Sequence, residues 1–251
     1  MMSMLARHIR TLAKRVVPHR VVFLVRRYTS GADDLRGAGN RERYRDHGDV
    51  PERTADGVDE VYGEFLGGGV EEWDARARAQ ASVAVELGLE PHHRMLEIGC
   101  GPGRATPRFA EALEPNRLVA FDQRPDFIEA ARASLEQHGV EPDSVRLEVV
   151  EAFDLRGLGV FDFAIAWSVL NHCTWGERAD FFERIVDHLA PRGRLVVTHG
   201  AWATTPWFLD WLEDVIARRG LRVVRRIDSP AEIESAEVSA GSVPMWVFER
   251  S

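Results

Sequence analysis

Three glycines at alternate positions lie at the centre of the residues whose spacing could support chemistry. Gly99, Gly101 and Gly103 follow an apolar run that ends at Ile98, and a helical pattern begins behind them. Glycine lets the backbone turn through positive φ and lets a ligand approach more closely than a Cβ would allow. A helix N-terminus behind such a turn offers unpaired N–H groups to an anionic or polar ligand. The stretch therefore predicts a binding turn for a nucleotide-like ligand.

The spacing of these glycines separates two kinds of nucleotide-like ligand. A dinucleotide fingerprint requires G-x-G-x-x-G, and Arg104 occupies the position where its third glycine would fall. The pattern that is present is E-x-G-x-G-x-G, in which Glu97 stands two residues before the first glycine and can reach a cation at the turn. A nicotinamide-dependent oxidoreductase is therefore the less favoured interpretation of the turn.

The elements around the turn alternate between strand-like and helical patterns from residue 94 onward, which predicts a parallel sheet covered on both faces. The predicted strands are Met95–Ile98, Arg117–Phe121, Val145–Val150, Phe161–Trp167, Arg194–Thr198, Leu221–Ile227 and Met245–Phe248. Thr106-Pro107 is expected to cap and start the first helix, and Pro191-Arg192-Gly193 is expected to turn the chain into the fifth strand. The segment 228–243 is too short and too polar for a comfortable crossover helix, so the last strand is expected to pair antiparallel. The predicted fold is α/β, a seven-stranded, mostly parallel, doubly wound sheet with an antiparallel last strand and an N-terminal helical extension.

The glycine pattern and the order of elements together resemble the class I S-adenosylmethionine-dependent methyltransferases, over residues 70–250. The resemblance implies that S-adenosylmethionine is the cofactor and that it lies at the carboxyl ends of the strands. The cofactor-binding candidates in the turn are Glu97, Gly99, Cys100, Gly101 and Gly103.

Further cofactor-binding candidates follow the second strand. Asp122 lies 19 residues after Gly103, a suitable place for a carboxylate that accepts hydrogen bonds from ribose hydroxyls. The alternative for this acid is a helix N-cap. Gln123 is the neighbour expected to flank the adenine.

After the third strand, Glu151-Ala152-Phe153 is similar to the acidic-residue-Ala segment of the family, in which the acid and adjacent backbone contact the adenine amino group. An ordinary surface loop is the alternative. Phe153, like Gln123, is a candidate to pack on the adenine face.

The run Trp167-Ser168-Val169-Leu170-Asn171-His172, after the fourth strand, bears on the acceptor. It lacks the polar-Pro-Pro-aromatic run of family members that methylate exocyclic base nitrogens. It is similar instead to a Val-Leu-His-His stretch common in small-molecule methyltransferases. Trp167 is included among the cofactor-binding candidates.

Histidines supply the candidate bases. Methyl transfer mainly requires proximity, alignment and a dry site, but an oxygen acceptor of high pKa must also lose its proton. Histidine suits that role near neutral pH. His172 is the first candidate and His199, after the fifth strand, is the second. Each has an alternative as a pocket-lining or structural residue.

The charge of the chain is unevenly distributed. The first thirty residues hold seven basic residues and no acid, whereas the remainder holds 25 basic and 40 acidic residues. The acidic body disfavours nucleic acid as a partner, because binding it needs a basic face. Residues 1–30 form a predicted basic amphipathic helix that would lie on a membrane surface or dock on a protein partner, with a solvated helix or tail as the alternative. Residues 31–69 are read as a linker or lid, and 70–251 as the methyltransferase core.

The two cysteines, Cys100 and Cys173, cannot build a disulfide framework, and the chain has no Cys/His metal spacing, so no metal site is expected. The expected location is the cytoplasm, with contact at the inner membrane surface as a further expectation.

The predicted function is methyl transfer from S-adenosylmethionine to a small-molecule or glycan/lipid-linked acceptor at oxygen. The alternative from another class is a non-catalytic S-adenosylmethionine-binding module.

Overall fold

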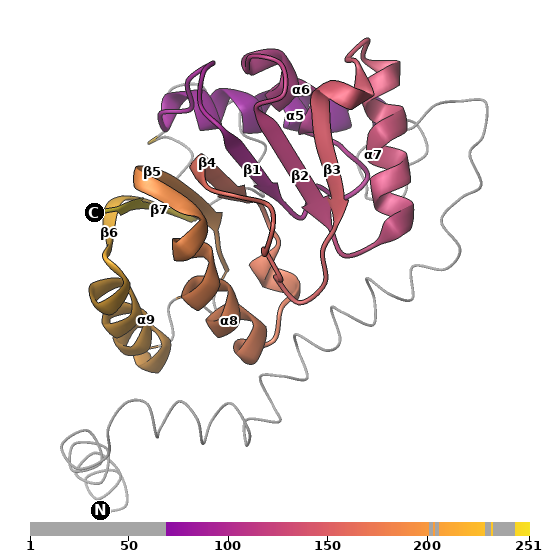
Figure 1. The fold of residues 1–251 in the computed structure, drawn as a ribbon. Helices are drawn as coiled ribbons and strands as arrows, with labels where there is room; N and C mark the ends of the chain where they lie inside the picture. Colours follow the sequence, from indigo (N-terminus) through magenta and orange to yellow (C-terminus); the bar gives the residue numbers. More distant parts are fainter. Residues whose placement is uncertain (1–68, 201–202, 204–205, 229–231, 233–243) are drawn as a thin grey trace, which may run out of the picture.

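The structure is a computed structural model that describes residues 69–200, 203, 206–228, 232 and 244–251 (Figure 1). The predicted basic helix in residues 1–30 and almost all of the predicted linker 31–69 lie outside the described residues. These two assignments therefore stay predictions. No helix in the described part of the chain is long and apolar enough to cross a membrane.

Within the described residues, seven strands form one sheet in the order β3-β2-β1-β4-β5-β7-β6. The strands are β1 Met95–Ile98, β2 Leu118–Asp122, β3 Val145–Val149, β4 Phe161–Ala166, β5 Leu189–Thr198, β6 Leu221–Ile227 and β7 Met245–Arg250. Neighbours among β1 to β5 are parallel, and β7 runs antiparallel to both β5 and β6. The predicted seven-stranded α/β sheet with an antiparallel last strand is confirmed, and β7 lies between β5 and β6.

Helices cover both faces of this sheet (Figure 1). They are α5 Gly69–Glu86, α6 Thr106–Ala112, α7 Pro125–Gln137, α8 Trp175–Ile185 and α9 Pro206–Arg219, with short 3₁₀ turns η1 Pro142–Ser144, η2 Leu170–His172 and η3 Val186–His188. Strand side chains alternate between two faces. Phe163 and Ile165 accordingly pack in a cluster with α5 and α6, whereas Ala164 and Ala166 pack in a cluster with α8 and α9.

The start of β5 differs from the prediction. The turn residues Pro191–Gly193 were expected to precede a strand that begins at Arg194, but β5 already begins at Leu189. Arg192 has a positive φ of 64°, and the register between β4 and β5 shifts between Phe161 and Phe163. An irregularity inside a strand can bend the chain as a turn does. The Pro-Arg-Gly signal therefore marks a bulge and not a strand boundary.

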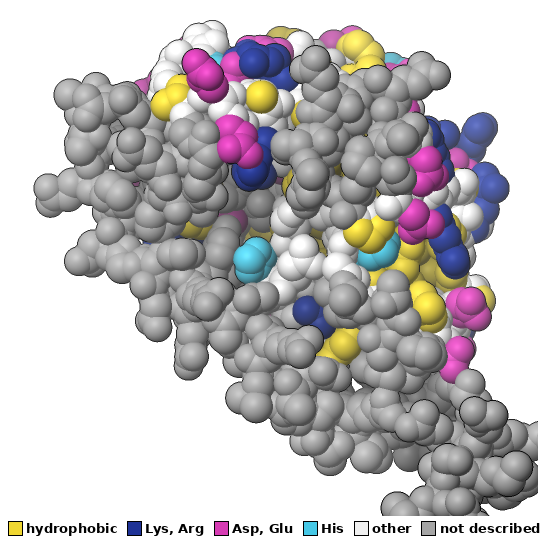
Figure 2. Space-filling model, turned by 180° about the vertical axis from the view of Figure 1, so that it is seen from behind, with side chains coloured by type: hydrophobic (Ala, Val, Ile, Leu, Met, Phe, Trp, Pro, Cys, Tyr) yellow, Lys and Arg dark blue, Asp and Glu magenta, His cyan; other side chains and the backbone are white. Residues whose placement is uncertain are grey.

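The described surface is rich in paired charges. Arg108 contacts both Asp74 and Glu111, and Arg218 contacts both Asp214 and Glu183. Figure 2, which views the molecule from behind relative to Figure 1, shows acidic and basic side chains next to one another on the described surface. The arginines of this part of the chain are thus largely matched by acids, in keeping with its acidic composition.

Candidate active site

The carboxyl ends of the central strands meet at one edge of the sheet. Ile98 at the end of β1 lies beside Phe121 of β2 on one side and Ala166 of β4 on the other. The N–H of Cys100 donates to the Phe121 carbonyl at 2.9 Å. The N–H of Val150 donates to the Asp122 carbonyl, also at 2.9 Å. The segments that follow β1, β2 and β3 are therefore joined by backbone hydrogen bonds.

The three glycines of the turn all have positive φ, with values of 68°, 58° and 85° for Gly99, Gly101 and Gly103. Their surroundings differ. A Cβ on Gly99 would lie 2.6 Å from a methyl carbon of Val169, and one on Gly103 would lie 2.6 Å from the Cα of Ala131 in α7. A Cβ on Gly101 would meet no described atom within 4 Å. Gly99 and Gly103 therefore allow close packing, and Gly101 borders open space that a ligand can enter.

Asp122 is a buried acid at the end of β2 that holds the glycine turn in place. One carboxylate oxygen accepts the N–H of Gly101 at 3.0 Å, and the other accepts the N–H of Arg124 at 3.1 Å. Burial raises the pKa of Asp122, and these backbone N–H groups act in the opposite direction. Arg124 is the N-cap of α7, so the alternative interpretation of Asp122 as that N-cap is wrong. Its contact with a ribose stays a prediction.

Glu97 is a second buried acid at the same edge. Thr106 donates its hydroxyl hydrogen to the Glu97 carboxylate at 2.8 Å. Burial raises the pKa of Glu97 to about 8, with a smaller increase from Asp122 and opposing effects from Thr106 and Arg104. The expectation that Thr106 caps α6 is wrong, because Ala105 is the N-cap and the Thr106 hydroxyl is used by Glu97.

The loop after β3 lies next to the end of β2. Glu151 and Ala152 are exposed, as is Gln123, whereas Phe153 is half-buried. The Phe153 ring meets the edge of Phe181 in α8, with centroids 5.2 Å apart at 67°. The structure therefore places these four predicted cofactor residues at the expected edge, with Phe153 packed against α8.

The segment after β4 carries His172 in η2 and is anchored at two points. Val169 packs so closely against Gly99 of the glycine turn that a Cβ on Gly99 would clash with it. The buried Arg178 of α8 donates from Nε to the Leu170 carbonyl at 2.8 Å. His172 itself is half-buried, and its N–H donates to the Val169 carbonyl at 3.0 Å.

His199 follows β5 and is buried. Its ring lies 4.3 Å from that of Trp246, with 39° between the planes. Burial lowers the pKa of His199, with Arg226 acting in the same direction and Asp228 in the opposite one. The stack on Trp246 and the neutral ring suit a packing role at least as well as that of a base.

The comparisons with known proteins find a match to a methyltransferase domain in the central part of the chain. A family model described as a methyltransferase domain matches residues 96–195, which run from β1 into β5. The matched residues, less than half of the chain, are therefore similar to a methyltransferase domain. A trans-aconitate 2-methyltransferase from Rhizobium leguminosarum bv. trifolii is 29% identical over 125 residues, covering 49% of this chain and 45% of that protein. The chain thus aligns with less than half of that relative.

Solved structures agree on the fold. Magnesium protoporphyrin IX methyltransferase from Synechocystis, with bound S-adenosylmethionine, superposes with a TM-score of 0.56 at 14% identity, covering 87% of this chain and 95% of that one. The N-methyltransferase NodS from Bradyrhizobium japonicum, in complex with S-adenosylhomocysteine, has a TM-score of 0.53 at 18% identity, covering 86% and 98%. Both likenesses show the fold. The open space at Gly101 beside two buried acids has room for a cofactor of the kind that those two structures hold.

Helix α5, which precedes the matched residues, contains a buried polar residue that sequence analysis missed. With its amide oxygen turned toward both donors, Gln80 of α5 accepts hydrogen bonds from Trp167 Nε1 at 3.1 Å and from Arg104 Nη2 at 2.8 Å. The Arg104 guanidinium also lies over the Trp73 ring, 5.3 Å from its centroid. Gln80 therefore ties α5 to the glycine turn and to the segment after β4.

A signal for Gln80 was available in the sequence. Trp73, Ala77, Gln80 and Ala84 are all buried and recur at helical spacing along one face of α5. A polar amide within an apolar stripe must find partners when that stripe is buried. The pattern could have marked Gln80 as bonded, although not which residues it would meet.

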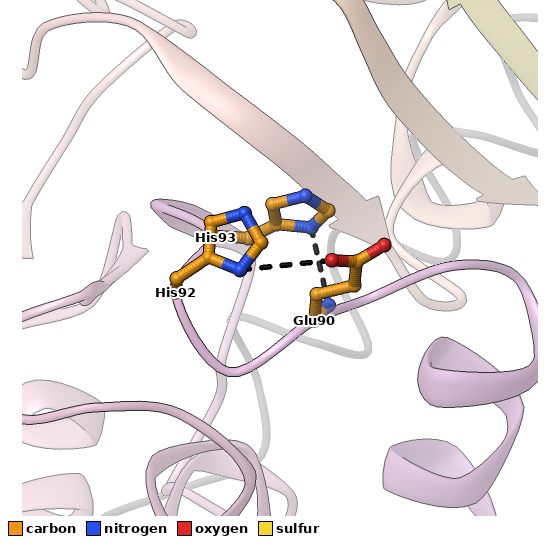
Figure 3. Close-up of side chains that lie close together, drawn as sticks. All are labelled: Glu90, His92 and His93. Atoms are coloured by element: carbon orange, nitrogen blue, oxygen red, sulfur yellow. Dashed lines mark hydrogen bonds and ion pairs between the residues drawn. The ribbon is translucent and has the colours of Figure 1, made fainter.

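One group of three potential metal ligands occurs among the described residues, namely Glu90, His92 and His93. Figure 3 shows the two rings and the carboxylate on the loop before β1, which is the opposite edge from the glycine turn. The Glu90 N–H donates to His93 Nδ1 at 3.1 Å, and His92 Nδ1 lies 3.6 Å from a Glu90 oxygen. These three residues lie before β1, at the end of the strand away from the glycine turn, so the group is outside the candidate active site.

Proposed function

We propose that the chain transfers the methyl group of S-adenosylmethionine to an oxygen atom of a small-molecule acceptor. The observation that carries the proposal is the contact between Gly99 and Val169, which joins the cofactor turn to the segment bearing His172. A reacting methyl group must be aligned with its acceptor, so the two segments must be held together. The names of the relatives, trans-aconitate 2-methyltransferases, support a small-molecule acid as acceptor.

In this proposal each group has a distinct task. The cofactor supplies a methyl group on a sulfonium, already activated for displacement. Gly101 leaves room for the cofactor. The Asp122 carboxylate accepts hydrogen bonds from the ribose hydroxyls, and Glu97 faces the ammonium group of the cofactor. His172 either accepts a proton from a hydroxyl acceptor or orients a carboxylate acceptor, which is already ionised at neutral pH.

A carboxylate is the first acceptor class to test, because it matches the named relatives and needs no base. The glycan- or lipid-linked acceptor and the membrane contact rest on residues 1–30, which lie outside the described residues. A cytoplasmic location accompanies the small-molecule proposal.

The test is transfer of a labelled methyl group from S-adenosylmethionine to a panel of small carboxylic acids, alcohols and phenols. Asp122→Ala should weaken binding of S-adenosylhomocysteine by about 1–3 kcal/mol, because it removes an acceptor of charged hydrogen bonds. Asp143→Ala, at a position 89% exposed in its side chain, is the matched control and should bind normally. Equal affinity in both variants would remove Asp122 from the cofactor site.

The pH profile separates the two acceptor classes. With a hydroxyl acceptor, His172→Asn should lower kcat by about 10²–10⁴-fold and remove the acidic limb of the profile. With a carboxylate acceptor the fall should be much smaller and the profile flat near neutral pH. Tight binding of S-adenosylhomocysteine with no labelled product in any fraction, including lipid and glycan extracts, would support the non-catalytic module instead.

A further inference from the structure

Two adjacent residues after β3 hold an unusual backbone conformation. Ala152 has φ of 49° and Phe153 has φ of 53°, in the left-handed region that residues other than glycine rarely adopt. Such conformations persist only where the surrounding structure holds them, and they concentrate at functional sites. The Asp154 N–H closes the turn on the Glu151 carbonyl at 3.0 Å. The loop therefore needs an external restraint.

That restraint comes from α8. Arg184 donates from Nη1 to the Ala152 carbonyl at 2.7 Å and to the Phe153 carbonyl at 3.4 Å. Phe181 meets the Phe153 ring edge-on. Phe181 and Arg184 are three residues apart on a helix and so share one face. Arg184 on that face thus binds the backbone of residues 152 and 153, and Phe181 packs against the side chain of Phe153.

The contact of Arg184 with the Ala152 carbonyl fixes the direction of the Phe153 N–H. In a trans peptide the N–H points opposite to the carbonyl of the preceding residue. Because the Ala152 carbonyl faces Arg184, the Phe153 N–H is directed away from α8. A donor in that position can pair with a ring nitrogen of a purine.

We propose that Arg184 is a positioning residue of the adenine subsite, holding residues 152 and 153 in the left-handed conformation that aims the Phe153 N–H at the base. The proposal rests on the proposed function, since it requires that the loop after β3 contacts the cofactor. Arg184 itself contacts only protein in this arrangement. Its side chain is 46% exposed and also lies 4.0 Å from Asp180.

The test compares Arg184→Met with wild type for binding of S-adenosylhomocysteine and of S-inosylhomocysteine by calorimetry. The inosine base has an oxo group in place of the amino group and a protonated neighbouring nitrogen. Arg184→Met should weaken S-adenosylhomocysteine binding by about tenfold, the value of one hydrogen bond between the backbone and the base, and S-inosylhomocysteine binding by less. The preference for the adenine compound should therefore fall. Since both affinities are measured on one sample, a reduced folded fraction cannot change their ratio.

A rescue variant and a control complete the design. Ala152→Gly in the Arg184→Met background should recover part of the lost affinity and preference, because glycine adopts positive φ without strain. Arg132→Met is the control, since Arg132 is 47% exposed and pairs with an acid on the surface of α7. If wild type fails to bind S-adenosylhomocysteine, the proposed function fails. If wild type binds and Arg184→Met shows the same affinity and the same preference, the positioning role is overturned.

Discussion

The two halves of the active-site edge are built by different means. The half after β1 and β2 is held by polar contacts to the backbone, such as those of Asp122 with Gly101 and Arg124. The half after β4 and β5 has fewer such contacts, among them that of Arg178 with the Leu170 carbonyl, and adds aromatic packing, such as that of His199 on Trp246. A polar contact to a backbone atom restricts which residue can stand at each position, whereas packing accepts many residues of similar volume. The first half is therefore the more specific in sequence.

The largest effect should come from substituting two glycines of the same turn. Gly103→Ala places a Cβ 2.6 Å from the Ala131 backbone, so it should lower the free energy of unfolding by about 2–4 kcal/mol. Gly101→Ala meets open space and should lower it by only about 1 kcal/mol, the cost of positive φ.

Cofactor affinity should show the reverse order. Gly101→Ala should weaken S-adenosylhomocysteine binding by more than about tenfold, because the new methyl group occupies the space of the ligand. Denaturant unfolding and calorimetry on both variants provide the check. If Gly101→Ala and Gly103→Ala lost the same stability, Gly103 would not be the position that packing requires and Gly101 would not border open space.

An intermediate effect is expected at the residue that joins the two halves. Gln80→Leu leaves the donors of Arg104 and Trp167 without their acceptor, which should lower the free energy of unfolding by about 1–3 kcal/mol. Gln80→Glu keeps an acceptor for both and should retain most of the stability. Denaturant unfolding of the two variants distinguishes these outcomes. If leucine is as stable as glutamate at this position, the amide is not a link between the turn and the segment after β4.

The same contrast explains how much could be predicted from the sequence. The glycine turn, Asp122 and the strands from β1 to β4 were predicted because local patterns constrain them. The turn before Arg194 and the capping role of Thr106 were predicted wrongly, since their outcomes depend on β4 and on Glu97. The contacts of Gln80 and Arg184 were missed because their partners lie far away in sequence and no local pattern specifies them.

Two pH dependences of opposite sign are also expected, one in each half. Burial raises the pKa of Glu97 to about 8 from an ordinary 4.5. The folded state therefore holds a proton that the unfolded state has released, and stability falls as pH rises from about 4.5 through 8. The pKa of His199 is lowered from 6.5, so the unfolded state binds more protons and stability falls as pH drops below about 6.5.

Thermal denaturation from pH 5 to pH 9 on three proteins separates these contributions. Glu97→Gln should remove the fall in stability between about pH 4.5 and 8. His199→Phe should remove the fall in stability below about pH 6.5, so the two variants separate the contributions where their pH ranges overlap. A bound ammonium facing Glu97 favours its carboxylate, so S-adenosylhomocysteine should bind more tightly as pH rises toward 8, by up to about tenfold per pH unit. Glu97→Gln should remove that dependence while His199→Phe keeps it. If His199→Phe instead changed the pH dependence of cofactor binding, the two halves of the edge would be coupled through His199, and its packing role would have to be abandoned.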